Sequence, residues 1–428
     1  MMNGLSSTIA RRSIFITAVI LGVLIRVWLW WVIPATQFAG DEKSYLQDGW
    51  TLAKTGVQTY FWPPGIVWLV AMLQKVGFDE NVKLYRLLWL VLDLGVAALV
   101  WKLAKKAGAR PGFCAGFYLL YIPAISFAIF VTSETPTVLD LLAGMALITA
   151  DTFLAAGFLI ALVVLARTNL AGLLGTLPLV IQPRRKAAAF AAVAILPVLA
   201  WPFWVQSHSG IFTLSTNSDL NIYAGNVDFQ EELNIFHPWS TKEQMAYRQR
   251  LMRGEDMQKN LTREEMRQEG IKSVKENKLL FMRRVVNRFA KLFSPRVAQM
   301  RLVGQERMMS AKQVFSPVPF FLLASTNLQW LLVAVFGTAG LLVMKTLRPL
   351  FLAVIAGSII FCLVAISQPR YSFPFEPLLI IAAGFFLSDW RAKWKELNKP
   401  LFLGAMCCLA WTWAAWAIFM LSSRSGLG

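Results

Sequence analysis

Cysteine and histidine are scarce in this chain of 428 residues, which contains four cysteines and two histidines. The cysteines all fall in apolar runs, so the sequence predicts neither a disulfide framework nor a thiolate metal site. They are Cys114, Cys362, Cys407 and Cys408. The histidines, His208 and His237, each stand alone, and two isolated histidines do not make a zinc site. We therefore predict no metal centre built on these residue types.

Acidic residues are also few, since 24 Asp and Glu stand against 42 Lys and Arg, for a net charge of +18. The basic residues cluster in loops and form no basic domain with a nucleic-acid motif, so no nucleic-acid partner is expected. Apolar residues are abundant: 57% of the chain is hydrophobic, with 17 Trp and 30 Phe. This composition is typical of a polytopic membrane protein, and we interpret the charge as topology and contact with membrane lipids.

Apolar runs separated by basic loops predict eleven membrane spans. They cover residues 13–33, 84–103, 112–131, 135–150, 152–166, 170–182, 187–205, 327–344, 349–367, 372–388 and 400–421. Arg11 and Arg12 place the N-terminus in the cytoplasm, and the apolar run that follows is too long for a signal-peptide core, so we interpret it as an uncleaved span. We expect residues 61–78 to lie at the external surface, because a crossing there would invert every later basic loop.

The predicted fold class is therefore an all-α polytopic membrane protein with external juxtamembrane helices, in three regions. Residues 1–205 form an N-terminal transmembrane module, whose first external loop, 34–83, carries the catalytic candidates. Residues 206–319 form one long external loop, partly helical, and residues 320–428 form the C-terminal transmembrane helices. No internal repeat stands out, which disfavours a transporter built from two related halves.

Charge alternation brings four separated elements to the external face: Asp41 with Glu42, Glu134, the turn region 217–226, and Arg370. A carboxylate can accept a proton from an attacking hydroxyl, and Arg or Lys can stabilise a departing phosphate. The elements therefore point to a transferase whose donor is a lipid phosphate. Asp41 and Glu134 are also a candidate pair for a divalent cation, although basic residues could neutralise the phosphate without one. No other cofactor is expected.

Several short motifs lie in these elements. They are Asp41-Glu42 followed by Tyr45, Ala53, Gly56 and Pro63-Pro64; Ser133-Glu134; Asn217 to Gly225-Asn226; and Arg370-Tyr371 with Pro374 and Pro377. In order and sidedness they resemble the GT-C superfamily of membrane glycosyltransferases, in its protein mannosyltransferase-like and lipid A aminoarabinose transferase-like branch. The resemblance implies an inverting enzyme of the inner (plasma) membrane that takes a sugar from a polyprenyl-phosphate donor on the periplasmic or external side. The acceptor, a lipid, glycan or protein, is not carried over, because the long loop shows no recognisable appended domain.

The resemblance implies roles for individual residues. Asp41 is the implied base, Glu42 supports it or contacts the acceptor, and Glu134 is the acid of the second external loop. The predicted residues for the donor phosphate are Arg370, Tyr371, Lys43, Arg167 and Arg284. The predicted acceptor or loop residues are Tyr45, Asn217, Asn221 and Asn226.

Two basic features have a second interpretation. Arg167 either reaches phosphate or snorkels from a helix end. The segment with Arg283, Arg284, Arg288 and Lys291 is interpreted as an amphipathic helix lying on lipid phosphates, with a solvated helix as the alternative.

Two other functions also stay open. A ligase that uses a diphosphate-linked oligosaccharide would need a larger basic site, which residues 283–312 could supply. A lipid or polysaccharide transporter would distribute ionisable residues along a central path, whereas the acids here concentrate at one surface. Inside the spans, Arg26 and Asp93 have similar expected depths. We predict that they form a structural ion pair, with a role in a donor groove as the alternative.

Overall fold

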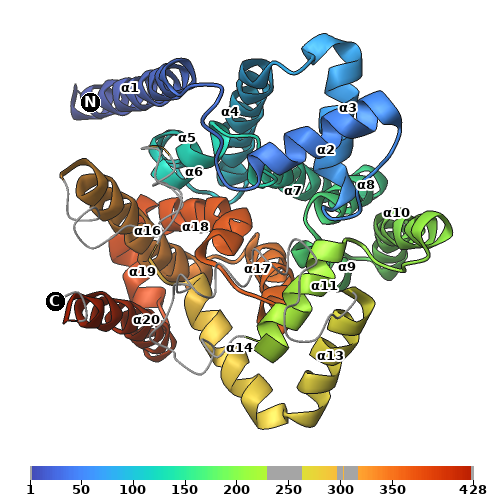
Figure 1. The fold of residues 1–428 in the computed structure, drawn as a ribbon. Coiled ribbons are helices and arrows are strands. Elements are labelled where there is room, and N and C mark those ends of the chain that lie inside the picture. Colours follow the sequence, from blue (N-terminus) through green and yellow to red (C-terminus); the bar gives the residue numbers. More distant parts are fainter. Residues whose placement is uncertain (1, 229–262, 296–301, 303–316, 426–428) are drawn as a thin grey trace.

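The computed structural model describes residues 2–228, 263–295, 302 and 317–425, and these residues contain helices and no strand. Figure 1 shows the arrangement. The first half contains α1 (Met2–Val32), α2 (Glu42–Thr55), α3 (Pro64–Leu73), η1 (Gln74–Phe78), α4 (Val82–Lys106), α5 (Pro111–Leu120), α6 (Ile122–Ala128), α7 (Glu134–Ile148), α8 (Phe153–Ala166), η2 (Thr168–Leu170), α9 (Leu173–Thr176), η3 (Pro178–Val180) and α10 (Arg184–Ser209). The second half contains α11 (Thr216–Tyr223), η4 (Ala224–Asp228), α13 (Arg263–Glu276), α14 (Lys278–Leu292), α16 (Pro317–Val343), α17 (Arg348–Val364), η7 (Pro369–Phe375), α18 (Glu376–Ser388), α19 (Trp390–Glu396) and α20 (Lys399–Ser425).

Proline and glycine set many of the helix ends. Proline occupies one of the first two positions of α3, α5, α17 and α18, where its missing N–H costs no helical hydrogen bond. Gly56 ends α2 and Gly210 ends α10, both with positive φ (71° and 75°). Each donates its N–H to a carbonyl of the preceding turn. Helix α2 begins directly after Asp41, and His208 lies in the last turn of α10. His237 lies outside the described residues.

Five of the described helices are long and apolar enough to cross a membrane, as expected of an α-helical membrane protein. They are residues 13–32 of α1, then α4, α10, α16, and η7 joined to α18. Helices α5 and α6 would form a sixth span, but they are bent by 62° where the sequence predicted one straight span. The predicted span at 170–182 is divided into η2, α9 and η3, and α16 begins ten residues before the predicted span. The total of eleven spans stays a prediction.

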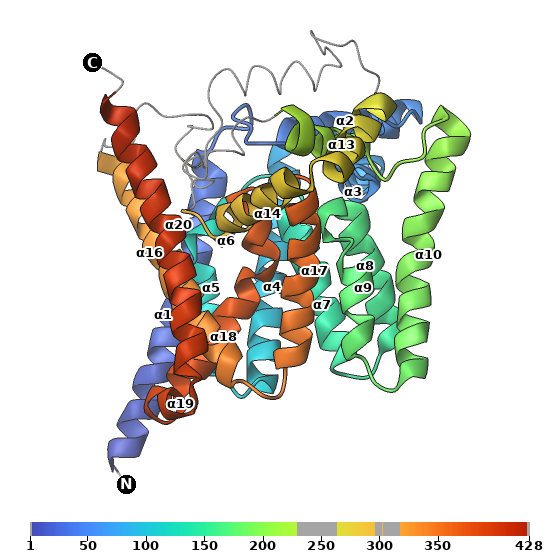
Figure 2. The same cartoon turned by 90° about the horizontal axis from the view of Figure 1, so that it is seen from below.

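The basic loops that the sequence assigned to the cytoplasm meet at one end of the molecule. Lys106 donates to the carbonyl of Thr149, and Lys186 pairs with Asp151 at 3.2 Å. Arg110 donates to the carbonyl that ends α18, at 2.9 Å. Figure 2 shows α2, α3 and α13 at one end of the long helices, with α19 and the N-terminus at the other.

The apolar core is formed where α4, α5, α7, α8 and α16–α18 pack together. Two glycines of α16 face α18, and a Cβ at Gly340 would lie 1.9 Å from the carbonyl oxygen of Ala382. The absent side chains therefore let these two backbones approach closely, as small residues do in membrane helix packing.

The predicted pair inside this bundle is confirmed. Arg26 Nε lies 2.7 Å from Asp93 Oδ2, and both side chains are fully buried. Tyr118 donates to the other carboxylate oxygen at 2.6 Å, and Arg26 also donates to the carbonyls of Gly22 and Leu119. Because these bonds connect α1, α4 and α5, the structural interpretation is the one that the geometry supports.

The first prediction concerns the membrane topology around η1. Helix α4 has 25 residues and is therefore about 37 Å long, and it begins just after η1. Cysteines at Val76 and Lys105, both exposed, should accordingly react with a membrane-impermeant maleimide from opposite sides of the membrane. The exposed Cys407 and Cys408 are replaced by serine beforehand, while the buried Cys114 and Cys362 serve as unreactive internal controls. Reaction of both sites from one side would mean that α4 does not cross the membrane. A third cysteine, at the exposed Val57, tests residues 61–78: it should react from the same side as Val76, and reaction from the opposite side would mean that residues 61–78 cross.

Candidate active site

A small polar cavity of about 70 Å³ lies where α2, α3, α7, α8, α11 and η7 meet. Carboxylates, guanidinium groups, amides and hydroxyls line most of it. The lining residues are Asp41, Tyr45, Trp62, Pro63, Ser133, Glu134, Ala166, Arg167, Thr168, Asn169, Asn217, Ser218, Asn221, Arg370 and Tyr371. All of these residues lie in loops or near helix ends, so the cavity lies at the boundary of the helical bundle.

Two ion pairs dominate this cavity. Arg370 Nη1 lies 3.0 Å from Asp41 Oδ2, and Arg167 Nη1 lies 2.9 Å from Glu134 Oε1. The Glu134–Arg167 pair is almost fully buried, whereas the Asp41 side chain keeps 26% of its surface exposed. Both guanidinium groups lie against the ring of Tyr371, with the Cζ atoms 5.6 and 5.7 Å from its centroid. Asp41 is thus the carboxylate that a substrate in the cavity can reach.

Some polar atoms at the cavity have no hydrogen-bond partner among the described residues. Arg370 Nε is a buried donor of this kind, and Asn217 Oδ1 is a buried acceptor. Leaving such atoms unpaired is costly, and native structures usually satisfy them with protein, water or ligand. One guanidinium donor, Arg370 Nε, and one amide acceptor, Asn217 Oδ1, therefore remain available to bind a molecule that carries an anion and hydroxyl groups.

A larger apolar cavity of about 350 Å³ adjoins the polar one. The two share the lining residues Thr168, Asn169, Ser218, Asn221 and Tyr371. The rest of the larger cavity is formed mainly by apolar side chains of α10, α17 and the segment before α11. These include Val198, Leu199, Pro202, Phe212, Phe361 and Ile366. A molecule with a charged head and an apolar tail would fit across both cavities.

Local sequence explains how these segments meet. Helix α3 begins against the end of α8, where a Cβ on Gly65 would lie 2.8 Å from the backbone nitrogen of Ala166. Glycine at this position therefore permits the close approach that brings the Pro63-Pro64 corner beside Arg167. On the other side, Asn217 donates its backbone N–H to the carbonyl of Phe61 at 3.1 Å, which fixes α11 over the same corner.

Tyr45 lies beneath the cavity as a neutral phenol. Burial and the nearby Asp41 carboxylate raise its pKa well above the usual value for tyrosine. Its ring packs on Trp62 with centroids 4.8 Å apart. Because the hydroxyl keeps its proton at neutral pH, Tyr45 adds a hydrogen-bond donor and no charge to the site.

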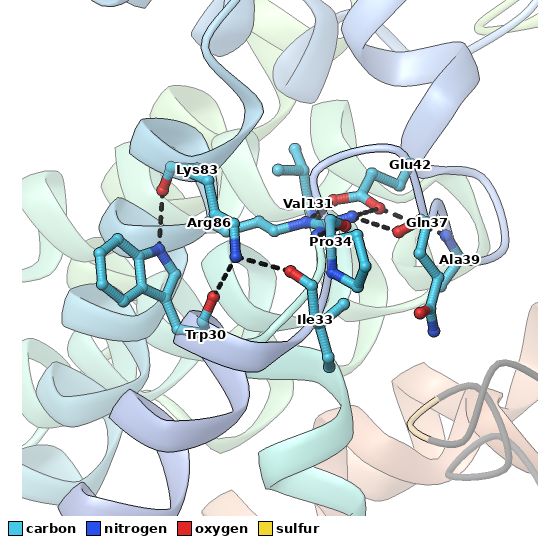
Figure 3. Close-up of polar contacts among 9 residues, drawn as sticks. All are labelled: Trp30, Ile33, Pro34, Gln37, Ala39, Glu42, Lys83, Arg86 and Val131. Carbon is cyan, nitrogen blue, oxygen red and sulfur yellow. Dashed lines mark hydrogen bonds and ion pairs between the residues drawn. The ribbon is translucent and has the colours of Figure 1, made fainter.

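The structure places Glu42 outside the cavity. Its carboxylate faces Arg86 of α4, with Nε to Oε1 and Nη2 to Oε2 both 2.9 Å, and both side chains are fully buried (Figure 3). The same carboxylate accepts the backbone N–H groups of Ala39 and Val131. This position corrects the sequence-based role of Glu42 beside the base, because all of these bonds point away from the cavity and into the bundle.

The Glu42–Arg86 pair instead connects the two acid-bearing loops. Arg86 also donates to the carbonyls of Pro34 (2.9 Å) and Gln37, so it binds the loop that precedes Asp41 (Figure 3). Val131 lies three residues before Glu134, and its N–H bond ties that loop to the same carboxylate. One buried ion pair thus sets the relative positions of the two carboxylates that line the cavity.

The residues that the sequence predicted for the site divide into two groups. Asp41, Glu134, Arg370, Tyr371, Arg167, Tyr45, Asn217 and Asn221 all line the cavity. Glu42, Lys43, Arg284 and Asn226 do not. Lys43 is exposed on α2, while Asn226 of η4 and Arg284 of α14 are buried and donate to the backbone carbonyls of Val364 and Asn226, respectively. Hydrophilic residue type alone could not separate the two groups, because their separation depends on which way each helix end faces.

Sequence reasoning missed several residues of the site. Thr168, Asn169 and Ser218 line both cavities, and Thr168 Oγ1 lies 2.7 Å from Ser218 Oγ. Arg86 was missed entirely, although an arginine within an apolar run is itself a signal of a buried partner.

Within the described ranges, no group of three or more His, Cys, Asp or Glu lies close enough to hold a metal ion. Asp41 and Glu134 line one cavity, but each has a guanidinium group as its nearest charged partner. Each of these carboxylates therefore has the positive charge of an arginine beside it.

The pair beneath the site gives a stability prediction. Glu42→Gln leaves the Arg86 guanidinium buried without its counter-charge, which typically costs about 3–5 kcal/mol. We expect a clear fall in the thermal unfolding midpoint of the purified protein, followed by tryptophan fluorescence. Lys54→Met, which breaks the exposed Lys54–Glu80 pair, is the control and should leave the midpoint nearly unchanged. A Glu42→Gln protein with a wild-type midpoint would contradict the assigned role.

Comparisons with known proteins add no relative: no family model, no curated protein sequence and no solved structure matches this chain.

Proposed function

We propose that this chain is a GT-C type inverting glycosyltransferase that moves a sugar from a polyprenyl-phosphate donor to an acceptor on the external face of the plasma membrane. The observation that carries the proposal is the joining of two cavities: a polar one with two carboxylate–arginine pairs, and an apolar one that shares five of its lining residues. A polyprenyl phosphate has the same two-part chemistry, with an anion at one end of a long hydrocarbon chain.

The phosphate would bind near Arg370 and Arg167. Arg370 has an unpartnered Nε and one nitrogen on Asp41, so its planar group can still donate to a phosphate oxygen. Both guanidinium groups lie against the ring of Tyr371, which keeps them close to each other. The first isoprene units would then extend into the apolar cavity between α10, α11 and α17.

Asp41 is the proposed base. The acceptor hydroxyl would lose its proton to the carboxylate of Asp41 as its oxygen forms a bond to the anomeric carbon. The bond from that carbon to the phosphate oxygen would break on the opposite side, and the electron pair would leave with the phosphate. Attack opposite the leaving group inverts the configuration, and the arginines stabilise the charge that develops on phosphate.

The sugar would lie among neutral side chains. Asn217, Asn221, Thr168 and Asn169 line the cavity, and their amides and hydroxyls suit the hydroxyl groups of a sugar ring. Glu134 is held by Arg167 and is nearly inaccessible, so we assign it to fixing that guanidinium. Glu42 acts only through its structural bonds to Arg86.

The direct test uses the full chain in lipid nanodiscs. We expect saturable binding of a polyprenyl monophosphate, and transfer from a panel of polyprenyl-phosphate sugars detected as release of the polyprenyl phosphate. Binding of polyprenyl diphosphate in preference to the monophosphate would favour the ligase alternative. Movement of labelled lipid between leaflets without any bond cleavage would favour a transporter.

The third prediction concerns the base. Asp41→Asn keeps the shape of the side chain but removes its capacity to accept a proton, so turnover should fall by about 10² to 10⁴ while donor binding persists. Single-turnover transfer at saturating donor measures this. Asp48→Asn is a matched control, since Asp48 lies on the same helix, bonds to Thr59 and does not line the cavity. An Asp41→Asn enzyme with normal turnover would remove Asp41 from the chemistry.

The fourth prediction concerns the phosphate group of the donor. Arg370→Lys keeps the charge but loses the planar donor pattern that contacts Asp41 and phosphate together, so apparent donor affinity should fall at least about tenfold. The affinity for polyprenyl monophosphate is measured directly. Arg348→Lys, at the exposed start of α17, should change nothing. Equal affinity in the Arg370→Lys protein and the wild type would place the phosphate elsewhere.

A further inference from the structure

Helix α14 is inverted relative to a helix on the surface of a soluble protein. Its polar side chains Arg284, Asn287 and Arg288 are buried against the rest of the molecule. Its apolar side chains Leu279, Met282, Val286 and Phe289 are exposed by 42–71%. These four follow the spacing of one helical face, so they form a continuous apolar stripe.

The buried arginines have a structural reason to face inward. Arg288 donates to the carbonyls of Leu363 (2.7 Å) and Val364 (2.9 Å), in the last turn of α17, and Arg284 donates to the carbonyl of Asn226. Carbonyls at a helix C-terminus lack intrahelical partners and carry partial negative charge, so a guanidinium group is well placed there. The sequence-based assignment of these arginines to lipid phosphates is therefore corrected.

The same bonds fix α14 where an apolar helix ends. Figure 2 shows α14 crosswise to α17, which runs along the long helices. The last turns of α17 expose Ile360 and Val364 by 41–45%, and Phe361 of the same turns lines the apolar cavity. Apolar side chains are thus exposed both on α14 and at the end of α17 that its arginines bind.

We propose that α14 lies in the membrane interface, with its stripe among the acyl chains just below the lipid headgroups. The exposed Lys278 and Arg283 flank the stripe on its two edges, where they can reach lipid phosphates. An interfacial helix of this kind places its apolar face about 5–10 Å into the headgroup–acyl boundary. The partner of this surface is membrane lipid, and the proposal does not depend on the glycosyltransferase assignment.

Lipid explains the inversion better than water does. A helix that faces water exposes its charged side chains and buries its apolar ones, whereas α14 buries Arg284 and Arg288 and exposes the four apolar side chains from Leu279 to Phe289. The charges that remain exposed lie at the edges of the stripe, as they do in helices that rest on a bilayer.

Spin labels on the full chain in nanodiscs containing anionic lipid test this proposal. Leu279→Cys, Met282→Cys, Val286→Cys and Phe289→Cys are labelled one at a time, after Cys407 and Cys408 are replaced by serine. Leu352→Cys on the exposed face of α17 is the lipid-facing control, and Gln268→Cys on α13 is the water-facing control. Collision rates with oxygen, which concentrates in lipid, and with a nickel chelate, which stays in water, are compared.

We expect all four stripe positions to resemble the Leu352 control, with strong oxygen collisions and weak nickel collisions. Collisions like those at Gln268 would show that the stripe faces water and would overturn the proposal. Protection from both reagents would show that protein covers the stripe, from this chain or another copy, and would overturn it equally.

Discussion

The arrangement of the candidate site depends on the cost of burying charge in an apolar bundle. A buried carboxylate or guanidinium group is tolerated only when it is paired and its remaining polar atoms are bonded. Glu42 and Arg86 satisfy this requirement together, because their remaining atoms bind backbone groups of two separate loops. Those bonds hold in register the segments that carry Asp41 and Glu134. A structural ion pair thus determines the geometry of a site in which it takes no direct part.

The same requirement shapes the cavity above this pair. Asp41 and Glu134 each have an arginine partner, so the four charges nearly cancel before any ligand arrives. An anion that binds there would share Arg370 with Asp41, because the guanidinium group has a donor, Nε, that Asp41 does not use. We interpret this shared arginine as the link between the donor phosphate and the base in the proposed reaction. The apolar cavity beside it supplies the surface that a lipid carrier needs.

Helix α14 meets the same requirement for charged side chains that face the interior of the protein. Its arginines turn inward because unpaired carbonyls at the end of α17 offer them partners. The apolar residues are then left on the outside, where lipid can accept them at no cost. Inward charge is stable here because the carbonyls satisfy it, and the outward apolar surface is the feature that the proposed lipid contact explains.

Much about this protein was determined by its sequence alone. The abundance of apolar runs predicted a helical membrane protein, with which the long apolar helices agree, and the similar depths of Arg26 and Asp93 predicted their ion pair. Charge alternation also brought Asp41, Glu134 and Arg370 to one cavity, because loop order along a bundle is readable from charge. Tertiary structure decided which of the neighbouring polar residues face that cavity. Glu42 is next to Asp41 in sequence yet points into the bundle, since consecutive side chains at the start of a helix diverge by about 100°. The partner that it finds there, Arg86, is 44 positions away, a separation that no local pattern encodes.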